Sequence, residues 1–414
     1  MATHADKTLE HISRSRKGKT VVRRIGWAVL ALVILLVLVV VAGVVYQGIA
    51  SAVDASTYPP PGRLVDVGDY RLHIHCTGSG GPGPAVILDA GNGGSSLDWS
   101  LVQPGVATFT RVCSYDRAGY GWSDSGPTPR TSGRIVSELH TLLVNAGVPG
   151  PYVLVGHSFG GLNMRLYAYT YPQDVAGLVL VDSSHEDDPT ARQAIMAGQQ
   201  QLSTCQHFAP FGVVRLLGSS NQFISPYPSA IQAVVKAHLY QTRFCGTWYD
   251  ESAAWDESIS QVRTARAQHS LGHLPLVVIT HGKDLDASWQ ALQNDLAGLS
   301  SNSTHVIASM SGHAIMFDQP DLVIAAIRQI VTKNLNAGHS FITSAMTSCK
   351  GQVTARLLHT TRGRAMNTIP FSYRRERRGD GTTSAPLLIP DMNTDKKVTK
   401  ALTESEERET ALSA

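Results

Sequence analysis

The stretch that most constrains the fold is Pro151–Gly161, which reads PYVLVGHSFGG. Its first half is an apolar run of strand character, and Leu162–Tyr171, which follows it, has helical character. Ser158 lies where the strand gives way to the helix, with a glycine two residues before it and another two residues after it. Such a turn is so sharp that the flanking positions leave no room for a Cβ, and it exposes the serine at the carboxyl edge of a sheet. The segment therefore predicts a strand–turn–helix unit that presents a hydroxyl nucleophile.

Further apolar, β-branched runs recur on both sides of this unit. Several are nearly continuous, such as AVIL and LVVI, as expected of strands that are buried on both faces of a parallel sheet. The first two runs flank Gly68-Asp69, which is a hairpin signal. The predicted strands are Arg63–Val67, Tyr70–Cys76, Ala85–Asp89, Arg111–Tyr115, Tyr152–Gly156, Gly177–Val181, Pro275–Thr280 and Thr304–Ala308.

Helical patterns lie between these strands. Apolar residues fall on one face of Arg134–Asn145, and they do so again in Asp321–Asn334, after a helix-start signal at Asp318 and Pro320. An opening hairpin followed by alternating strands and helices indicates a doubly wound α/β domain. We therefore expect eight mostly parallel strands with helices on both faces of the sheet.

The alternation breaks in residues 185–274, which we interpret as a mainly helical insertion, here called the cap. It has several helical stretches and three aromatic patches but no clear strand pattern. The core of the domain then divides into residues 63–184 and 275–334. Residues 335–414 lose apolar periodicity and contain the charged runs RRERRGD and ESEERET, so we predict a largely disordered tail.

The N-terminal part predicts a membrane anchor. Residues 1–24 are rich in lysine and arginine, and they lead into the uncharged segment Ile25–Tyr46, here called the apolar block, which is about long enough to cross a bilayer. The positive-inside rule then places the N-terminus in the cytoplasm and the remainder outside it. A cleaved signal peptide is the alternative, because Ala50-Ser51-Ala52 resembles a cleavage site, but the block is longer than a usual signal core. Residues 47–62, with three consecutive prolines, are predicted to be an extended linker.

Charge and cysteines narrow the classes of partner. A net charge of +3 is too mild to indicate nucleic-acid binding. In an oxidising compartment disulfides can form, and Cys76 could meet Cys113 across the sheet while Cys205 and Cys245 share the cap. Clustered Cys/His spacing is absent from the sequence, which argues against a zinc site, and we expect neither a metal nor a cofactor.

A serine hydroxyl needs an adjacent base to act as a nucleophile. His313 is the best candidate for this base. It lies in Met310-Ser311-Gly312-His313, a loop between the last predicted strand and the last predicted helix. From that loop an imidazole can hang over the edge of the sheet where Ser158 is expected.

With these residues in place, the chain resembles the α/β-hydrolase superfamily, in particular its serine esterase and lipase-like branch. The resemblance covers about Arg63 to Asn334. Besides the serine turn it is carried by VILDAGNGGSSLDW after the third strand, SYDRAGYGWSD after the fourth, and SGHAIMFDQPDLV around the histidine. In the first of these, Ala90 stands where the superfamily usually has histidine. The resemblance implies that the backbone amides of Asn92 and Phe159 form the oxyanion hole.

The resemblance also implies a carboxylate that orients His313, but the sequence leaves its identity open. The superfamily usually places it shortly after the strand that precedes the histidine strand, where this chain reads LVVITHGKDLD. We therefore favour Asp284, with Asp286 as a minor candidate. Some members take the acid from the end of the preceding strand, which would make Asp182 the alternative.

These residues predict a hydrolase that cleaves carboxylic esters through a Ser-His-Asp triad and an acyl-enzyme. The aromatic patches of the cap and the membrane anchor favour apolar or lipidic acyl groups. Acyl transfer or another reaction on the same triad is a second reading, and a non-catalytic ligand-binding homologue is a third. The oligomeric state cannot be predicted from the sequence.

Overall fold

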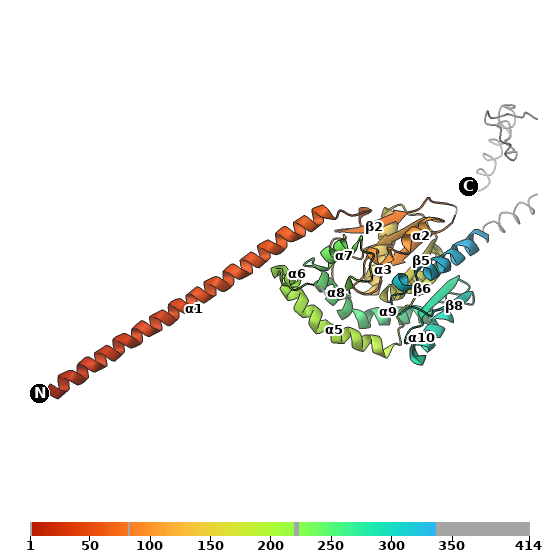
Figure 1. Ribbon diagram of the computed structural model, residues 1–414. Helices are drawn as coiled ribbons and strands as arrows, with labels where there is room; N and C mark the ends of the chain where they lie inside the picture. The colour runs from red at the N-terminus through yellow and green to blue at the C-terminus, as the bar shows by residue number, and fades with distance from the viewer. Residues whose placement is uncertain (1, 82, 219–222, 337–414) are drawn as a thin grey trace, which may run out of the picture. The chain divides into compact units, whose positions relative to one another are not determined.

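The computed structural model describes residues 2–81, 83–218 and 223–336 (Figure 1). Within these residues, eight strands form one sheet in the order β1-β2-β4-β3-β5-β6-β7-β8. The pairs β1–β2 and β2–β4 are antiparallel, and the neighbours from β4 to β8 are parallel. The strands are β1 (Arg63–Asp66), β2 (Arg71–Thr77), β3 (Ala85–Asp89), β4 (Val112–Tyr115), β5 (Tyr152–His157), β6 (Val175–Val181), β7 (Leu276–His281) and β8 (Ser303–Ala308). The mostly parallel eight-stranded sheet is thus confirmed, with most boundaries within one or two residues.

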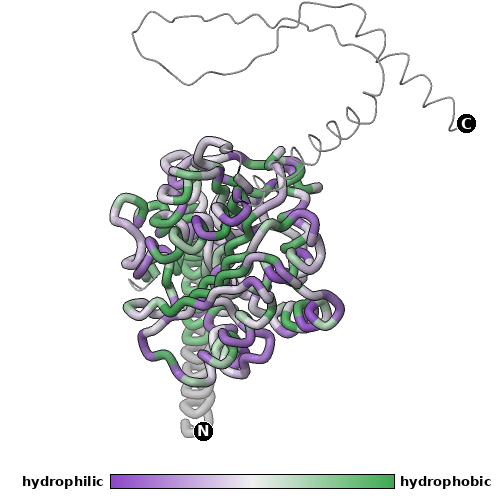
Figure 2. The backbone as a smooth tube through the Cα atoms, turned by 90° about the vertical axis from the view of Figure 1, so that its right-hand side faces the viewer, coloured by the Kyte–Doolittle hydropathy of each residue, from purple (hydrophilic) through white to green (hydrophobic). Residues whose placement is uncertain are grey.

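The sheet is covered on both faces, as expected. Alternate residues of the same strand enter two separate cores: in β3, Ile87 belongs to one core, whereas Val86 and Leu88 belong to the other. Figure 2 shows hydrophobic strands running through the interior, with more hydrophilic segments around them. The helices of the core are α2 (Gln103–Ala107), α3 (Ser132–Asn145), α4 (Phe159–Thr170), α10 (Ala287–Ala297), α11 (Ile315–Asp318) and the helical residues 320–336.

Two of these helices begin at side-chain caps. The Thr131 hydroxyl accepts a hydrogen bond from the amide of Arg134 at the start of α3, which satisfies an amide that has no partner within the helix. Asp286 does the same for the amide of Trp289 in α10. This minor candidate for the catalytic acid therefore acts as a helix cap.

The cap contains α5 (Pro189–Phe208), α6 (Val213–Leu217), α7 (Gln232–Leu239), α8 (Phe244–Ala253) and α9 (Trp255–Gln268), so its helical character is as expected. A disulfide between Cys205 and Cys245 joins α5 to α8, and another between Cys76 and Cys113 joins β2 to β4. The cysteine pairs are those anticipated from the sequence.

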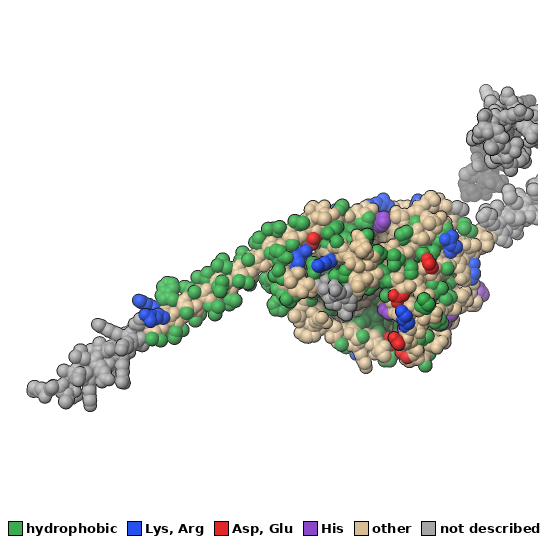
Figure 3. All heavy atoms as spheres, viewed as in Figure 1, with side chains coloured by type: hydrophobic (Ala, Val, Ile, Leu, Met, Phe, Trp, Pro, Cys, Tyr) green, Lys and Arg blue, Asp and Glu red, His purple; other side chains and the backbone are tan. Residues whose placement is uncertain are grey.

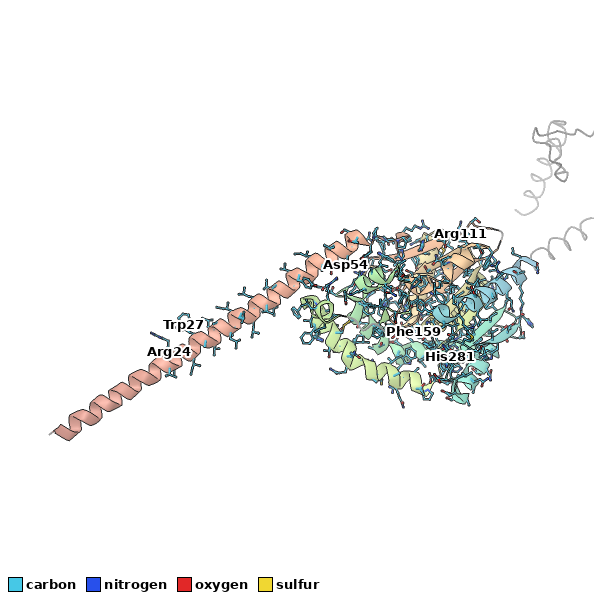
Figure 4. The ribbon with its side chains drawn as sticks, viewed as in Figure 1. Arg24, Trp27, Asp54, Arg111, Phe159 and His281 are labelled. Carbon is cyan, nitrogen blue, oxygen red and sulfur yellow. A yellow bond between two sulfur atoms is a disulfide. The ribbon has the colours of Figure 1, made fainter. Side chains whose placement is uncertain are left out.

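The N-terminal helix α1 (Ala2–Thr57) contains the apolar block and extends beyond it. Residues Val21–Thr57 are long and apolar enough to cross a membrane, and Arg24 and Trp27 project from this helix in Figure 4. The prediction of an extended linker over residues 47–62 is wrong, because the helix continues to Thr57. Residues 47–57 contain only one glycine and no proline, and the helix ends just before the Tyr58-Pro59 step, where proline disfavours a helical predecessor. Of the predicted tail, residues 337–414 lie outside the described residues.

Candidate active site

The serine turn has the expected geometry. Ser158 follows β5 with φ 50° and ψ −119°, a conformation that L-residues rarely adopt, and α4 begins at the next residue. A Cβ on Gly156 would overlap the backbone of Gly160, and a Cβ on Gly160 would overlap the carbonyls of Asp89 and Ala90, so close packing requires both flanking glycines. The backbone of Ser158 is tied to β6 and its loop, because its amide donates to Val181 O at 3.2 Å and its carbonyl accepts from Ser184 N at 3.0 Å.

His313 meets a carboxylate at the end of the neighbouring strand. Its Nδ1 lies 2.5 Å from Oδ2 of Asp182, the residue that follows β6. Asp182 is fully buried and has φ 43°, so its backbone leaves the strand in a turn that directs the side chain along the sheet edge. Since β6 lies beside β5, this pair is placed next to the serine turn.

In the structure His313 is thus paired with the alternative candidate, Asp182, and not with the preferred Asp284. Asp284 is exposed and lies in a turn after β7, with φ 54°. That turn does approach the histidine loop, but through backbone: the amides of Gly282 and Lys283 both donate to the carbonyl of Ser311, at 3.2 and 2.9 Å. Within the described residues, His313 has no hydrogen bond to Asp284.

Two residues that sequence reasoning did not assign complete the surroundings of Asp182. His281, the last residue of β7, places Nδ1 2.8 Å from Asp182 Oδ2, and its amide donates to Oδ1 at 3.1 Å. The indole of Trp289 donates to Oδ1 at 3.0 Å. Burial alone raises the pKa of Asp182, but the hydrogen bonds from His313, Trp289 and His281 outweigh it and lower that pKa below its ordinary value. The carboxylate is thus held ionised.

The serine and the histidine are not joined by a hydrogen bond within the described residues. The nearest hydroxyl partner of Ser158 is Ser184, with 3.5 Å between the two Oγ atoms. The side chain of His313 is 53% exposed. Catalytic hydrogen bonds in unliganded enzymes are often long and tighten only around a substrate.

His157, the residue before Ser158, contacts the loop that carries His313. Its Nε2 lies 3.0 Å from the carbonyl oxygen of His313, and the two rings are 4.7 Å apart. Burial, reinforced by the nearby His313, lowers the pKa of His157 to about 3. His157 therefore stays neutral and donates its Nε2 proton to hold the backbone of His313.

We expect His157 to make the fold sensitive to acid. Its pKa falls from 6.5 to about 3 on folding, so below pH 6.5 the unfolded chain binds a proton that the folded chain does not. Stability is then lost as the pH falls through this window, by about 2 kcal/mol between pH 7 and pH 5 for this one group. Chemical unfolding of the full chain in detergent at both pH values measures the loss.

The variant His157→Gln should show a smaller loss of stability between the same two pH values than the wild type. Replacement of the exposed His269 by Gln serves as the control and should leave the wild-type difference unchanged. Equal pH dependence in the wild type and His157→Gln would contradict the assignment of a buried neutral imidazole.

The loop after β3 is held by a buried ion cluster. Arg117 donates to the carbonyls of Ala90 and Gly91, both at 2.7 Å, and to Asp89 at 2.8 Å. Its Nε donates at 2.8 Å to Glu251, a residue of the cap helix α8. Burial alone lowers the pKa of Arg117, but the charges of Glu251 and Asp89 raise it well above its usual range. The guanidinium therefore stays charged. It links Asp89 of the core, the loop after β3 and Glu251 of the cap.

The same loop carries Asn92, and it lies directly over the serine turn. A Cβ on Gly91 would come within 3.3 Å of the Ser158 Cβ. The Asn92 side chain donates to Glu251 at 2.9 Å and accepts from the indole of Trp248. Phe159 begins α4, where the first amides have no acceptor within the helix. Of the two residues expected to form the oxyanion hole, Phe159 directly follows Ser158, and Asn92 follows Gly91, which approaches it. Figure 4 labels Phe159 and also His281, the last residue of β7.

Two further features of the described residues concern metal ligands and a cavity away from Ser158. These residues hold no group of three or more His, Cys, Asp or Glu side chains that could bind a metal ion. A cavity lined by residues such as Gly83, Arg111 and Asn334 lies at the amino ends of the strands, the opposite edge of the sheet from Ser158.

Known proteins share sequence and fold with this chain. The uncharacterized protein YqjL of Bacillus subtilis is 27% identical over 256 residues, which cover 61% of this chain and 85% of YqjL. A thermophilic esterase from Thermogutta terrifontis superimposes with a TM-score of 0.50 at 21% identity, over 64% of this chain and 94% of the esterase. The epoxide hydrolase CorEH superimposes with a TM-score of 0.51 at 17% identity, over 66% and 98% of the two chains. At such identities the two structures show the fold alone.

The relatives differ in how much of their own length is shared. The chain matches 85% of YqjL but only 42% and 56% of two further curated relatives. The model of the alpha/beta hydrolase family matches residues 72–326, more than half of the chain, and it includes Ser158, Asp182 and His313. The chain therefore belongs to the α/β-hydrolase family.

Proposed function

We propose that this protein is a serine hydrolase that cleaves carboxylic esters through Ser158, His313 and Asp182. The observation that carries the proposal is the position of Ser158 in a strained turn at the end of β5, beside the His313–Asp182 pair at the end of β6. A serine in this turn argues against the epoxide-hydrolase and dehalogenase branches of the α/β-hydrolase superfamily, whose nucleophile is an aspartate.

The mechanism is acyl transfer in two steps. Ser158 Oγ attacks the ester carbonyl while His313 Nε2 takes its proton, and Asp182 stabilises the imidazolium that forms. The backbone amides of Asn92 and Phe159 stabilise the oxyanion, and the alcohol leaves with the proton returned by His313. Water, deprotonated by His313, then releases the acid from Ser158.

The cap favours an apolar acyl group. Trp248 lies against Gly93 in the loop after β3. Its ring contacts those of Phe223 and Phe244, with centroid distances of 6.2 Å and 5.7 Å respectively. Aromatic surface so close to the reacting carbonyl would bind an alkyl or aryl chain better than a charged one. The substrate we propose is therefore a small ester or a lipid.

The location we propose is a membrane surface outside the cytoplasm. α1 is long and apolar enough to span a bilayer, and the basic residues precede its apolar block. The disulfides Cys76–Cys113 and Cys205–Cys245 fit an oxidising compartment on that side. The anchor, rather than a cleaved signal, agrees with the polar contacts between α1 and the cap, such as Gln47 with Tyr240.

Hydrolysis of p-nitrophenyl esters of increasing chain length tests the proposal. The full chain in detergent should release nitrophenolate, and Ser158→Ala should abolish the release. The neighbouring Ser184 supplies a matched control, since Ser184→Ala removes a hydroxyl 3.5 Å away and should keep activity. A folded wild type that cleaves none of the esters, or a Ser158→Ala variant as active as the wild type, would contradict the assignment.

A further inference from the structure

The cap touches α1 where the apolar block ends. A Cβ on Gly43 would overlap the carbonyl of Phe211, and the ring of Tyr46 lies against Gly212. Both glycines therefore allow the turn before α6 to approach the helix closely. Gly43 is three residues before the end of the block, and at 1.5 Å per residue this contact lies about 5 Å inside it.

Polar contacts also hold the cap against α1, and they lie just after the C-terminal end of the apolar block. Gln47, which is 2% exposed, donates from Nε2 to the carbonyl of Tyr240 at 2.8 Å. Arg215 of α6 forms an ion pair with Asp54 of α1 at 2.7 Å, and its side chain is 11% exposed. The charge of α6 is thus directed at α1, whose Asp54 is labelled in Figure 4.

The neighbouring apolar side chains, in contrast, are exposed. Leu217 is 83% exposed, Leu216 68% and Phe208 50%. These three residues, here called the cap lip, flank the Phe211–Gly212 turn that touches the apolar block. Figure 3 shows hydrophobic side chains along α1 and on the adjoining face of the cap. An exposed apolar patch that lies next to a membrane-spanning surface indicates that the patch also contacts lipid.

We propose that the cap lip inserts into the interface of the bilayer that α1 spans, so that its partner is a phospholipid surface. The inference rests on α1 as the membrane anchor. Amphipathic elements of this kind bury their apolar face roughly 5–10 Å into the boundary between headgroups and acyl chains, which matches the depth of the Gly43 contact. Full burial of a leucine or phenylalanine contributes about 1.5–3 kcal/mol, so three such residues suffice to hold the cap there.

The docking does not need anionic lipid. Arg215, the basic residue in the last turn of α6, is engaged by Asp54. The contribution of the lip is therefore hydrophobic, and neither salt nor phosphatidylserine should alter it strongly.

A lipid-quenching experiment on the full chain tests the contact. In a Cys349→Ser background, Leu217→Cys is labelled with a fluorophore, and the protein is placed in phosphatidylcholine nanodiscs with or without spin-labelled lipid. Val37→Cys, which is 55% exposed in the apolar block, is the positive control. Ile307→Cys, which is 41% exposed on β8, is the negative control, and Figure 1 shows β8 far from α6.

The label at Leu217 should lose about half of its fluorescence, as expected at an interfacial depth. The label at Ile307 should keep its fluorescence, and 0.5 M salt should leave both values unchanged. Equal, small quenching at positions 217 and 307 would overturn the proposal. So would a label at 217 that is shielded from water but not quenched by lipid, which would mean that protein covers the lip. Because the readout involves no catalysis, it is independent of whether Ser158 cleaves esters.

Discussion

The variant Asp182→Asn is expected to lower kcat for a p-nitrophenyl ester by about 10⁴-fold, the size of effect seen when an analogous triad carboxylate is replaced by its amide. Asn keeps the size of the side chain and can still accept hydrogen bonds from Trp289 and the amide of His281. The Asn side chain cannot stabilise the imidazolium of His313. Its amide group also favours the tautomer of His313 in which Nε2 carries the proton and cannot act as the base. KM should change little, because Asp182 is fully buried and does not touch the substrate.

The matched control is Asp284→Asn. Asp284 is exposed in the turn after β7, so its replacement should leave activity within about twofold. If Asp284→Asn were the inactive variant and Asp182→Asn the active one, the pairing seen in this structure would not be the catalytic one. His281→Phe adds a further test, since it removes the second imidazole from Asp182 but keeps the carboxylate; we expect a smaller loss than for Asp182→Asn.

The second large effect is expected at Arg117. Arg117→Met should lower the free energy of unfolding by about 3–5 kcal/mol, because it leaves the buried carboxylates of Asp89 and Glu251 without their partner. It also removes the donors that hold the carbonyls of Ala90 and Gly91. The loop over Ser158 should then loosen, so activity should fall even at temperatures where the variant is folded. Chemical unfolding in detergent, followed by tryptophan fluorescence, measures the stability.

Arg192→Met is the matched control for this prediction. Arg192 also binds a cap carboxylate, that of Asp256, but the two side chains are 54% and 56% exposed, so the pair is screened by water. We expect almost no change in stability. If Arg117→Met lowered the free energy of unfolding as little as Arg192→Met, the ion cluster of Arg117 would not hold the cap and the loop after β3 together.

Much of the fold follows from local sequence because buried parallel strands are continuous apolar runs. Runs such as Ala85–Asp89 coincide with strands as observed, and the glycines around Ser158 are explained by close backbone contacts. The carboxylate that pairs with His313 is harder to predict, because Asp182 and Asp284 both follow apolar strands. Their difference is geometric: β6 is next to β5 in the sheet, whereas β7 is one strand further away and already contributes His281 to Asp182.

Contacts between distant segments are the part that the sequence does not reveal. Glu251 meets Arg117 across 134 positions of the chain, from a cap that has no strand pattern to place it. The packing of the end of α1 is another such contact, because Gln47 and Asp54 are held by the cap. The same contacts bring the anchor to the cap, which no local pattern predicts.

The central claim is that Ser158 is an activated nucleophile. Its most direct test is labelling of the full chain by a fluorophosphonate probe, followed by mass spectrometry of the labelled peptide. We expect one modification, at Ser158, which is strongly reduced in Asp182→Asn and His313→Ala and retained in Ser184→Ala. A folded protein that does not react, or that reacts at another residue, would contradict it.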